Sequence, residues 1–199
     1  MSAGIEIIKQ QGRPIRTNDI LRLGIHPRTL YAMAKSRAIT RLSRGIYVLS
    51  GKQVENPDIV IASIRVPKGV ICLTSALSFH NITTQIPHEV HMALPRPSKH
   101  PKEAGHLPFR FYSFSGECYS SGIEKHTISG TEVRVYSPEK TIADCFKFRN
   151  KIGLDVAVEA LRYCLEHKKS TPRKILPFAR ICRVDKVIMP YLEAFQWTA

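Results

Sequence analysis

Long apolar runs are missing from this 199-residue sequence, because no stretch approaches the roughly 18 uninterrupted apolar residues that a membrane-spanning helix needs. The N-terminal residues also lack the charged start, apolar core and cleavage site of a secretory signal peptide. These two absences argue against membrane insertion and against export. We therefore expect a cytoplasmic protein with no membrane partner.

Cysteine is scarce and follows no metal-binding spacing. The sequence contains five cysteines, an odd number, and no CxxC pair. We expect reduced thiols that pack as small apolar side chains, as is typical of cytoplasmic proteins. The five are Cys72, Cys118, Cys145, Cys164 and Cys182.

Familiar catalytic and nucleotide-binding motifs are lacking as well. Neither GxxxxGK[ST] nor GxGxxG occurs. Residues 88–91, His-Glu-Val-His, are one residue short of the HExxH metalloprotease motif, and on a strand the two histidines would point to opposite faces. We therefore expect no metal ion, no cofactor and no enzymatic activity.

Acidic residues are few: 16 Asp and Glu stand against 30 Lys and Arg, which gives a formal net charge of +14. Such an excess favours a polyanionic partner, either nucleic acid or an acidic membrane surface. A metal-dependent nuclease needs several carboxylates to hold its ions, so their shortage argues against one. A DNA-tethered nuclease or nucleotide-handling enzyme stays open as an alternative.

The positive charge is concentrated near the N-terminus. Residues 1–52 hold ten basic and two acidic side chains, whereas the other 147 residues hold twenty and fourteen. More than half of the excess therefore lies in about a quarter of the chain. This asymmetry predicts an N-terminal polyanion-binding module followed by a less basic body.

The first 36 residues have the punctuation of three short helices. The pattern predicts a first helix over Gly4–Gln11 and a second over Asn18–Leu23, with Thr17 as its N-cap. Gly24 suits the left-handed end of the second helix, and the third runs from Pro27 to about Ser36. Two helices joined by a tight turn with glycine are typical of a helix-turn-helix.

Two short β-prone runs follow the third helix. Residues Ile39–Leu42 and Ile46–Leu49 flank the turn Ser43–Gly45, which predicts a hairpin. A hairpin after the recognition helix is a wing. We therefore expect a small winged helix-turn-helix that binds double-stranded DNA, and the alternative is three helices that merely pack on the main domain.

The residues expected to contact DNA lie on the outer face of the third helix and on the wing. In such motifs the N-terminal half of the recognition helix enters the major groove, where arginine can bond guanine with two hydrogen bonds. Arginines beside the wing turn are placed to meet phosphates or a minor groove. The predicted DNA-binding residues are His26, Arg28, Thr29, Tyr31, Lys35, Arg41, Ser43 and Arg44.

The remaining chain predicts strands followed by helices, which is typical of an α+β domain. Strands are predicted over His88–Leu94 and Phe109–Phe114, with a hairpin of His126–Ile128 and Thr131–Tyr136 around Ser129–Gly130. Helices are predicted over Asp58–Val66, Thr74–His80, Leu154–His167, from Pro138 to about Asn150 with Ser137 as cap, and from Pro172 to Phe195 with kinks or breaks at Pro177 and Pro190.

The fold class is therefore α+β, with an N-terminal winged helix-turn-helix and a mixed α+β C-terminal domain. The predicted domain boundaries are 1–50 for the DNA-binding domain, 51–58 for a linker and 59–199 for the C-terminal domain. The charged side chains of Asp144, Lys147, Arg149 and Lys151 could grip a phosphate or form the solvated face of a helix. The basic, proline-rich loop 95–102 is either a connector or a second polyanion contact.

Three strings of the sequence resemble one protein family. Residues 24–49 (GIHPRTLYAMAKSRAITRLSRGIYVL) look like the winged helix of AbiEi-type antitoxins, and residues 73–96 and 134–162 (RVYSPEKTIADCFKFRNKIGLDVAVEALR) resemble the C-terminal portion of the same family. The winged-helix string is shared by many regulators. Its combination with SPEKTIADCFKFRNKIG is much more specific.

The resemblance implies an antitoxin of a type IV toxin–antitoxin pair, associated with phage abortive infection. The winged helix would bind repeats in the promoter of the shared operon and repress it. The C-terminal domain would counteract a nucleotidyltransferase-like toxin without forming a stable complex with it, and the basic positions Lys147, Arg149 and Lys151 are candidates for that role. A plain transcriptional regulator with a sensing C-terminal domain and no toxin is the alternative.

Overall fold

The structure is a computed structural model that describes residues 2–98 and 107–196. Contacts divide these residues into two compact units that are interleaved along the chain. The first unit comprises residues 2–67, 107 and 126–133, and the second comprises residues 68–98, 108–125 and 134–196. The predicted boundaries at residues 50 and 58 stay a prediction. The first unit also contains a helix and the tip of a hairpin that lie beyond residue 50 in the sequence.

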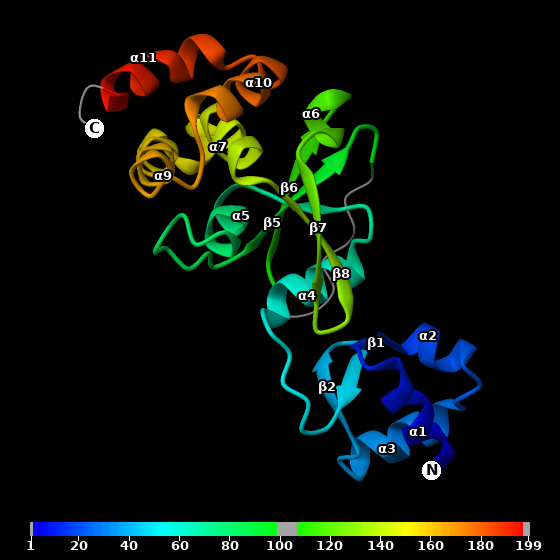
Figure 1. Cartoon of the computed structure of the whole chain (residues 1–199). Helices are drawn as coiled ribbons and strands as arrows, with labels where there is room; N and C mark the ends of the chain where they lie inside the picture. The colour runs from blue at the N-terminus through cyan, green and yellow to red at the C-terminus, as the bar shows by residue number, and fades with distance from the viewer. Residues whose placement is uncertain (1, 99–106, 197–199) are drawn as a thin grey trace. The chain divides into compact units, whose positions relative to one another are not determined.

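The first unit contains three N-terminal helices and a small antiparallel sheet (Figure 1). Its strands lie in the order β1-β3-β2, and Ile8, Ile20, Leu30 and Met33 fill the core between sheet and helices. The elements are α1 (Ser2–Gln11), β1 (Ile15–Arg16), α2 (Thr17–Arg22), α3 (Pro27–Lys35), β2 (Ile39–Ser43), β3 (Ile46–Leu49) and α4 (Pro57–Arg65). The predicted winged helix-turn-helix is confirmed.

Local signals account for where α3 begins. Gly24 has φ +85° directly after α2, a left-handed conformation that glycine adopts without strain. Pro27 occupies the first turn of α3, and the ring Nδ1 of His26 accepts a hydrogen bond of 3.2 Å from the backbone N–H of Arg28. The helix therefore begins where the sequence predicts.

The predicted N-cap of α2 is wrong by one residue. Arg16, not Thr17, holds the N-cap position, and Thr17 is the first helical residue. The cause is strand pairing, because Arg16 pairs with Ile46 of β3 and the Thr17 N–H donates to the carbonyl of Gly45 at 2.9 Å. This pairing keeps Arg16 extended and places the start of the helix after it.

The larger sheet has five strands in the order β6-β5-β4-β8-β7. β5 pairs parallel with β6 and antiparallel with β4, and β4 pairs parallel with β8. The strands are β4 (Val70–Ile71), β5 (Val90–Pro95), β6 (Phe109–Phe114), β7 (Ile123–Ile128) and β8 (Thr131–Tyr136). The prediction for β6 is confirmed, whereas β4 is not predicted, β5 begins two residues late and β7 begins three residues early.

Helices of the second unit gather beside its part of this sheet (Figure 1). α7 is the central one and packs against α5, α9 and α10. The helices are α5 (Leu73–Phe79), α6 (Glu117–Ser120), α7 (Pro138–Lys147), α8 (Arg149–Ile152), α9 (Leu154–Glu166), α10 (Pro172–Cys182) and α11 (Asp185–Gln196). Strands followed by helices confirm the mixed α+β assignment.

Two details of the predicted helices need correction. The helix that Ser137 caps ends at Lys147 and not near Asn150, because the chain turns at Phe148, whose ring packs 5.1 Å from that of Tyr112. The last stretch divides at neither predicted proline. Pro177 and Pro190 lie inside α10 and α11, and the break falls at Arg183, which adopts a left-handed conformation.

A buried ion pair sits at the centre of the second unit. Lys140 Nζ lies 2.5 and 2.6 Å from the two carboxylate oxygens of Asp144, and both side chains are 0% exposed. The same ammonium faces the ring of Tyr136 at 4.3 Å and that of Phe114 at 4.9 Å. Burial raises the pKa of Asp144, and the charge of Lys140 opposes that rise. The expectation that Asp144 belongs to a solvated charged face is therefore wrong.

Removal of one partner of this pair should be strongly destabilising. We expect Asp144→Ala to lower the free energy of unfolding by about 3–5 kcal/mol, since Lys140 would stay buried without a counter-charge. Urea unfolding followed by circular dichroism measures this. The paired change Lys140→Met with Asp144→Leu should lose much less, and an equal loss in both variants would contradict the explanation.

Candidate nucleic-acid interface

The outer face of α3 forms a continuous exposed stripe. Arg28, Tyr31, Ala32 and Lys35 are all exposed, at the i, i+3, i+4 and i+7 spacing of one helical face. The opposite face buries Leu30 and Met33 in the core of the first unit. The helix α3 therefore presents two cations, Arg28 and Lys35, and the aromatic ring of Tyr31, which is 65% exposed.

Two predicted contacts lie at the edge of this stripe. His26 is exposed, but its Nδ1 is engaged by the backbone of Arg28, so Nε2 is the ring nitrogen left for a ligand. Thr29 is half-buried and its methyl group lies beside Gly4 of α1, where an added Cβ would come within 3.7 Å. The stripe of Arg28, Tyr31 and Lys35 is therefore better placed to enter a groove than Thr29.

The wing presents two arginines beside its turn. Arg41 and Arg44 are exposed, and Arg41 Nε donates a long hydrogen bond of 3.4 Å to the carbonyl of Ser43. The Ser43 hydroxyl is half-buried and accepts a hydrogen bond of 2.8 Å from Arg65 Nη2 at the end of α4. Of the predicted wing residues, the two arginines are available to a ligand, while Ser43 fastens the wing to α4.

Arg16, Arg44 and Arg65 form a like-charged group that we call the arginine cluster. Burial lowers the pKa of Arg65, and the nearby charges of Arg16 and Arg44 lower it further. Within the described part of the chain, Nη1 of Arg65 and Nη2 of Arg16 are buried and have no hydrogen-bond partner. Arg44 is the exposed member of the cluster, whereas Arg16 and Arg65 are half-buried. A guanidinium group at the surface suits an anion, and phosphate is an anion that arginine binds well.

Sequence reasoning missed Arg16 and Arg65 as members of this interface. Arg16 stands on a strand of two residues, which is too short to show an alternating pattern. Arg65 lies well beyond the predicted module, on a helix assigned to the body of the protein. The sequence did contain a usable signal, because Arg65 is the one charged residue in the apolar run 59–66. An arginine among apolar residues buries its aliphatic stem and needs a polar environment for its guanidinium group.

The three basic residues predicted as a C-terminal patch have separate surroundings. Lys147 is exposed and lies 3.3 Å from Cys118 Sγ, and Lys151 is exposed and faces the rings of Tyr112 and Phe148 at 5.9 and 5.8 Å. Arg149 is half-buried and donates to the carbonyl of Phe146 at 2.8 Å, which closes the end of α7. The loop predicted at 95–102 lies outside the described residues from position 99 onward.

The truncated histidine motif has an unexpected geometry. Because β5 begins at Val90, His88 lies before the strand, and the prediction that His88 and His91 point to opposite faces is wrong. Both line one pocket of the second unit. Over residues 2–98 and 107–196, no three His, Cys, Asp or Glu side chains come together as a metal site requires.

The helices of these same residues are too short or too polar to span a bilayer.

A helix-turn-helix followed by a hairpin, with cations on the outer face of its last helix, defines the winged-helix class. Residues 5–50 match the model of a family described as "Transcriptional regulator, AbiEi antitoxin". The predicted resemblance to AbiEi-type antitoxins is thus confirmed over this segment, and it supports a DNA-binding antitoxin. The matched segment runs from α1 to the end of β3 and includes the wing.

A solved structure shares the fold across nearly the whole chain. The crystal structure of the RV2827C protein from Mycobacterium tuberculosis matches with a TM-score of 0.56 and 10% sequence identity. The match covers 96% of this chain and 79% of that chain. At this identity the similarity extends to the fold alone. A comparison with curated proteins finds no significant match.

The arginine cluster predicts a salt-dependent stability that does not involve DNA. Salt screens repulsion among like charges, so the thermal midpoint of unfolding should rise between about 50 mM and about 500 mM NaCl. Arg65→Gln should reduce this rise because it removes the cation that the other two repel. The control Arg22→Gln removes the same charge from an exposed residue 3.7 Å from Asp19 and should keep the wild-type rise. An unchanged rise in Arg65→Gln would contradict mutual repulsion.

Proposed function

We propose that this protein is a cytoplasmic repressor of its own operon and the antitoxin of a type IV toxin–antitoxin pair that serves in abortive infection. Its direct partner is double-stranded DNA at promoter repeats, and it opposes a nucleotidyltransferase-like toxin without a stable complex. No catalytic step belongs to the proposal. The main support is the exposed stripe of Arg28, Tyr31 and Lys35 on α3, together with the exposed Arg41 and Arg44 of the wing.

In this proposal α3 lies in the major groove. Arg28 and Tyr31 are in the N-terminal half of α3, the part of a recognition helix that meets base edges, and Lys35 follows one turn later. The arginine cluster and Arg41 then contact the phosphates on one side of that groove. Because Arg65 bonds Ser43, the wing reaches the DNA in a fixed arrangement and less conformational entropy is lost on binding.

Arg28 is the residue expected to read a base. Arg28→Ala should weaken binding to the duplex upstream of the protein's own coding sequence by about 1–3 kcal/mol, with a smaller loss on random DNA. Fluorescence anisotropy at fixed salt measures both affinities. The matched control is Arg173→Ala, an exposed arginine of α10 in the second unit, which should change neither affinity. Equal losses on the two duplexes would make Arg28 a phosphate contact.

Arg44 is expected to contact phosphate only. If about five phosphates are neutralised, a plot of log affinity against log salt should have a slope of about −4 to −5, and Arg44→Gln should make it shallower by about 0.9. Its losses on specific and random DNA should be equal. A slope that does not change in this variant would place the wing turn away from the DNA.

The antitoxin half of the proposal depends on a neighbouring gene product. Expression of that product alone should stop growth, and co-expression of this protein should restore it. Arg28→Ala should still restore growth, because neutralisation is assigned to the C-terminal portion and repression to α3. A neighbour that is harmless when expressed alone would favour the alternative of a plain regulator with a sensing domain.

A further inference from the structure

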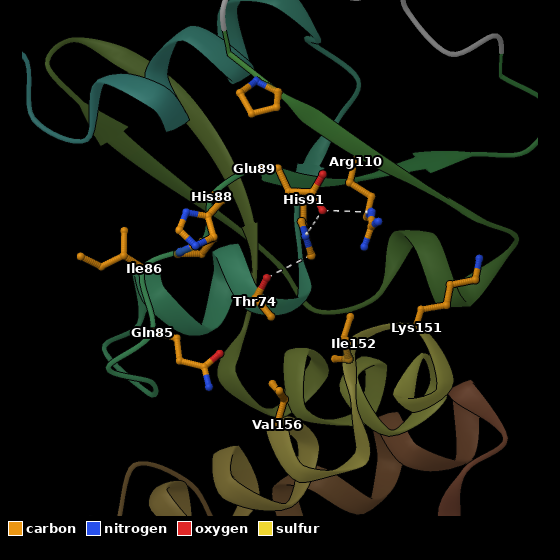
Figure 2. Close-up of a pocket in the computed structure, with 12 residues that line it drawn as sticks. Thr74, Gln85, Ile86, His88, Glu89, His91, Arg110, Lys151, Ile152 and Val156 are labelled. Atoms are coloured by element: carbon orange, nitrogen blue, oxygen red, sulfur yellow. Dashed lines mark hydrogen bonds and ion pairs between the residues drawn. The ribbon is translucent and has the colours of Figure 1, made fainter.

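The second unit contains a pocket of about 740 Å³ that lies outside the proposed DNA interface. Side chains from α5, the segment before β5, β5 itself, β6, α8 and α9 line it (Figure 2). Its volume lies within the range that holds small-molecule ligands in other proteins. The family match ends at residue 50, before any of these residues.

A chain of hydrogen bonds fixes the polar wall of this pocket. His91 Nδ1 lies 3.1 Å from Thr74 Oγ1, and His91 Nε2 lies 3.3 Å from Glu89 Oε1, which also accepts from Arg110 Nε at 3.0 Å (Figure 2). The backbone N–H of His91 donates to Ser75 Oγ at 2.9 Å. These contacts hold the side chains in place before any ligand arrives.

The protonation of His91 determines how this chain runs. Its side chain is 7% exposed, and burial lowers the pKa of His91, with Glu89 opposing the shift. The imidazole is therefore neutral at neutral pH, so Nε2–H donates to Glu89 and Nδ1 accepts the hydroxyl proton of Thr74. The Thr74 oxygen is thereby left as an acceptor at the pocket wall.

Positive charge gathers on one side of the pocket. Arg110, with 53% of its side chain exposed, and the exposed Lys151 lie on the same side in Figure 2. Glu89 is the one carboxylate among the described lining residues, so two cations face a single anion. A guanidinium and an ammonium that approach from different elements suit a phosphate group, whose oxygens accept from several directions.

The remaining walls offer an apolar floor and a neutral polar side. Ile152 and Val156 lie below the polar chain, and Gln85 and His88 lie across from the cations (Figure 2). Ile86 borders the same space with 85% of its surface exposed, so it offers apolar surface to a ligand. A bound molecule would cover it.

We propose that this pocket binds a small organic phosphate of about mononucleotide size. The phosphate lies against Arg110 and Lys151, a donor on the body of the molecule bonds to Thr74, and its apolar face rests on Ile152 and Val156. This site is separate from the DNA interface and does not depend on the function proposed above. It gives the C-terminal portion a ligand-binding activity of its own.

The test is isothermal titration of the full chain with the four common nucleoside 5′-monophosphates, ribose 5-phosphate and inorganic phosphate. At least one organic phosphate should bind saturably, with one site per chain and more tightly than inorganic phosphate. Lys151→Met should weaken it by about tenfold or more, as the loss of a charge-assisted contact does. Val156→Trp, which fills the floor, should abolish binding.

Control variants locate the bound molecule. Lys174→Met removes an exposed lysine of α10 outside the pocket, and Arg44→Gln removes a cation of the wing; both should bind like wild type. Because Lys151 is exposed, its variant should fold normally, which unfolding by circular dichroism verifies. The proposal is overturned if no organic phosphate saturates the wild-type chain, or if folded Lys151→Met binds as tightly as wild type. A loss of binding in Arg44→Gln would place the bound molecule at the wing instead.

Discussion

Repulsion among Arg16, Arg44 and Arg65 is the physical constraint on the wing side of the first unit. Like charges stay together only where other contacts hold them, and here strand pairing fixes Arg16 while the Ser43 hydroxyl fixes Arg65. The free protein therefore keeps guanidinium donors buried and unused within the described residues. A phosphate beside the exposed Arg44 would offset the repulsion. The same geometry ties α4 to the wing and extends the interface beyond the segment that the family match covers.

Charges in the second unit are handled differently. Lys140 and Asp144 neutralise each other within α7, and their role is structural. The pair also contacts other elements, because Lys140 faces the rings of Tyr136 and Phe114 and Asp144 accepts a hydrogen bond from Cys182 of α10. Arg110 combines features of the arginine cluster and of the buried pair. Glu89 accepts one of its hydrogen bonds, while about half of its side chain stays exposed. The contrast separates charges that stabilise the fold from charges that remain available to a ligand.

Features with a local physical cause could be predicted from the sequence. The left-handed Gly24, the Ser137 cap and the periodic exposed face of α3 all follow from neighbours within one or two turns. Strands β1 and β4 could not, because two residues show no alternation and form only by pairing with distant strands. The burial of Asp144 was missed since periodicity cannot anticipate that a charged pair neutralises itself in the core. The arginine cluster and the pocket join residues far apart in the chain, so only tertiary structure brings them together.

A photo-crosslink from position 31 tests the central claim most directly. Tyr31 is 65% exposed, so a benzoylphenylalanine can replace it without disturbing the core. The account predicts that irradiation joins this residue to the duplex upstream of the protein's own coding sequence, and that excess unlabelled duplex suppresses the product. The same replacement at Leu154, which is exposed on α9, should give no product. A duplex that binds but crosslinks at neither position, or equally at both, would contradict the placement of α3 in the groove.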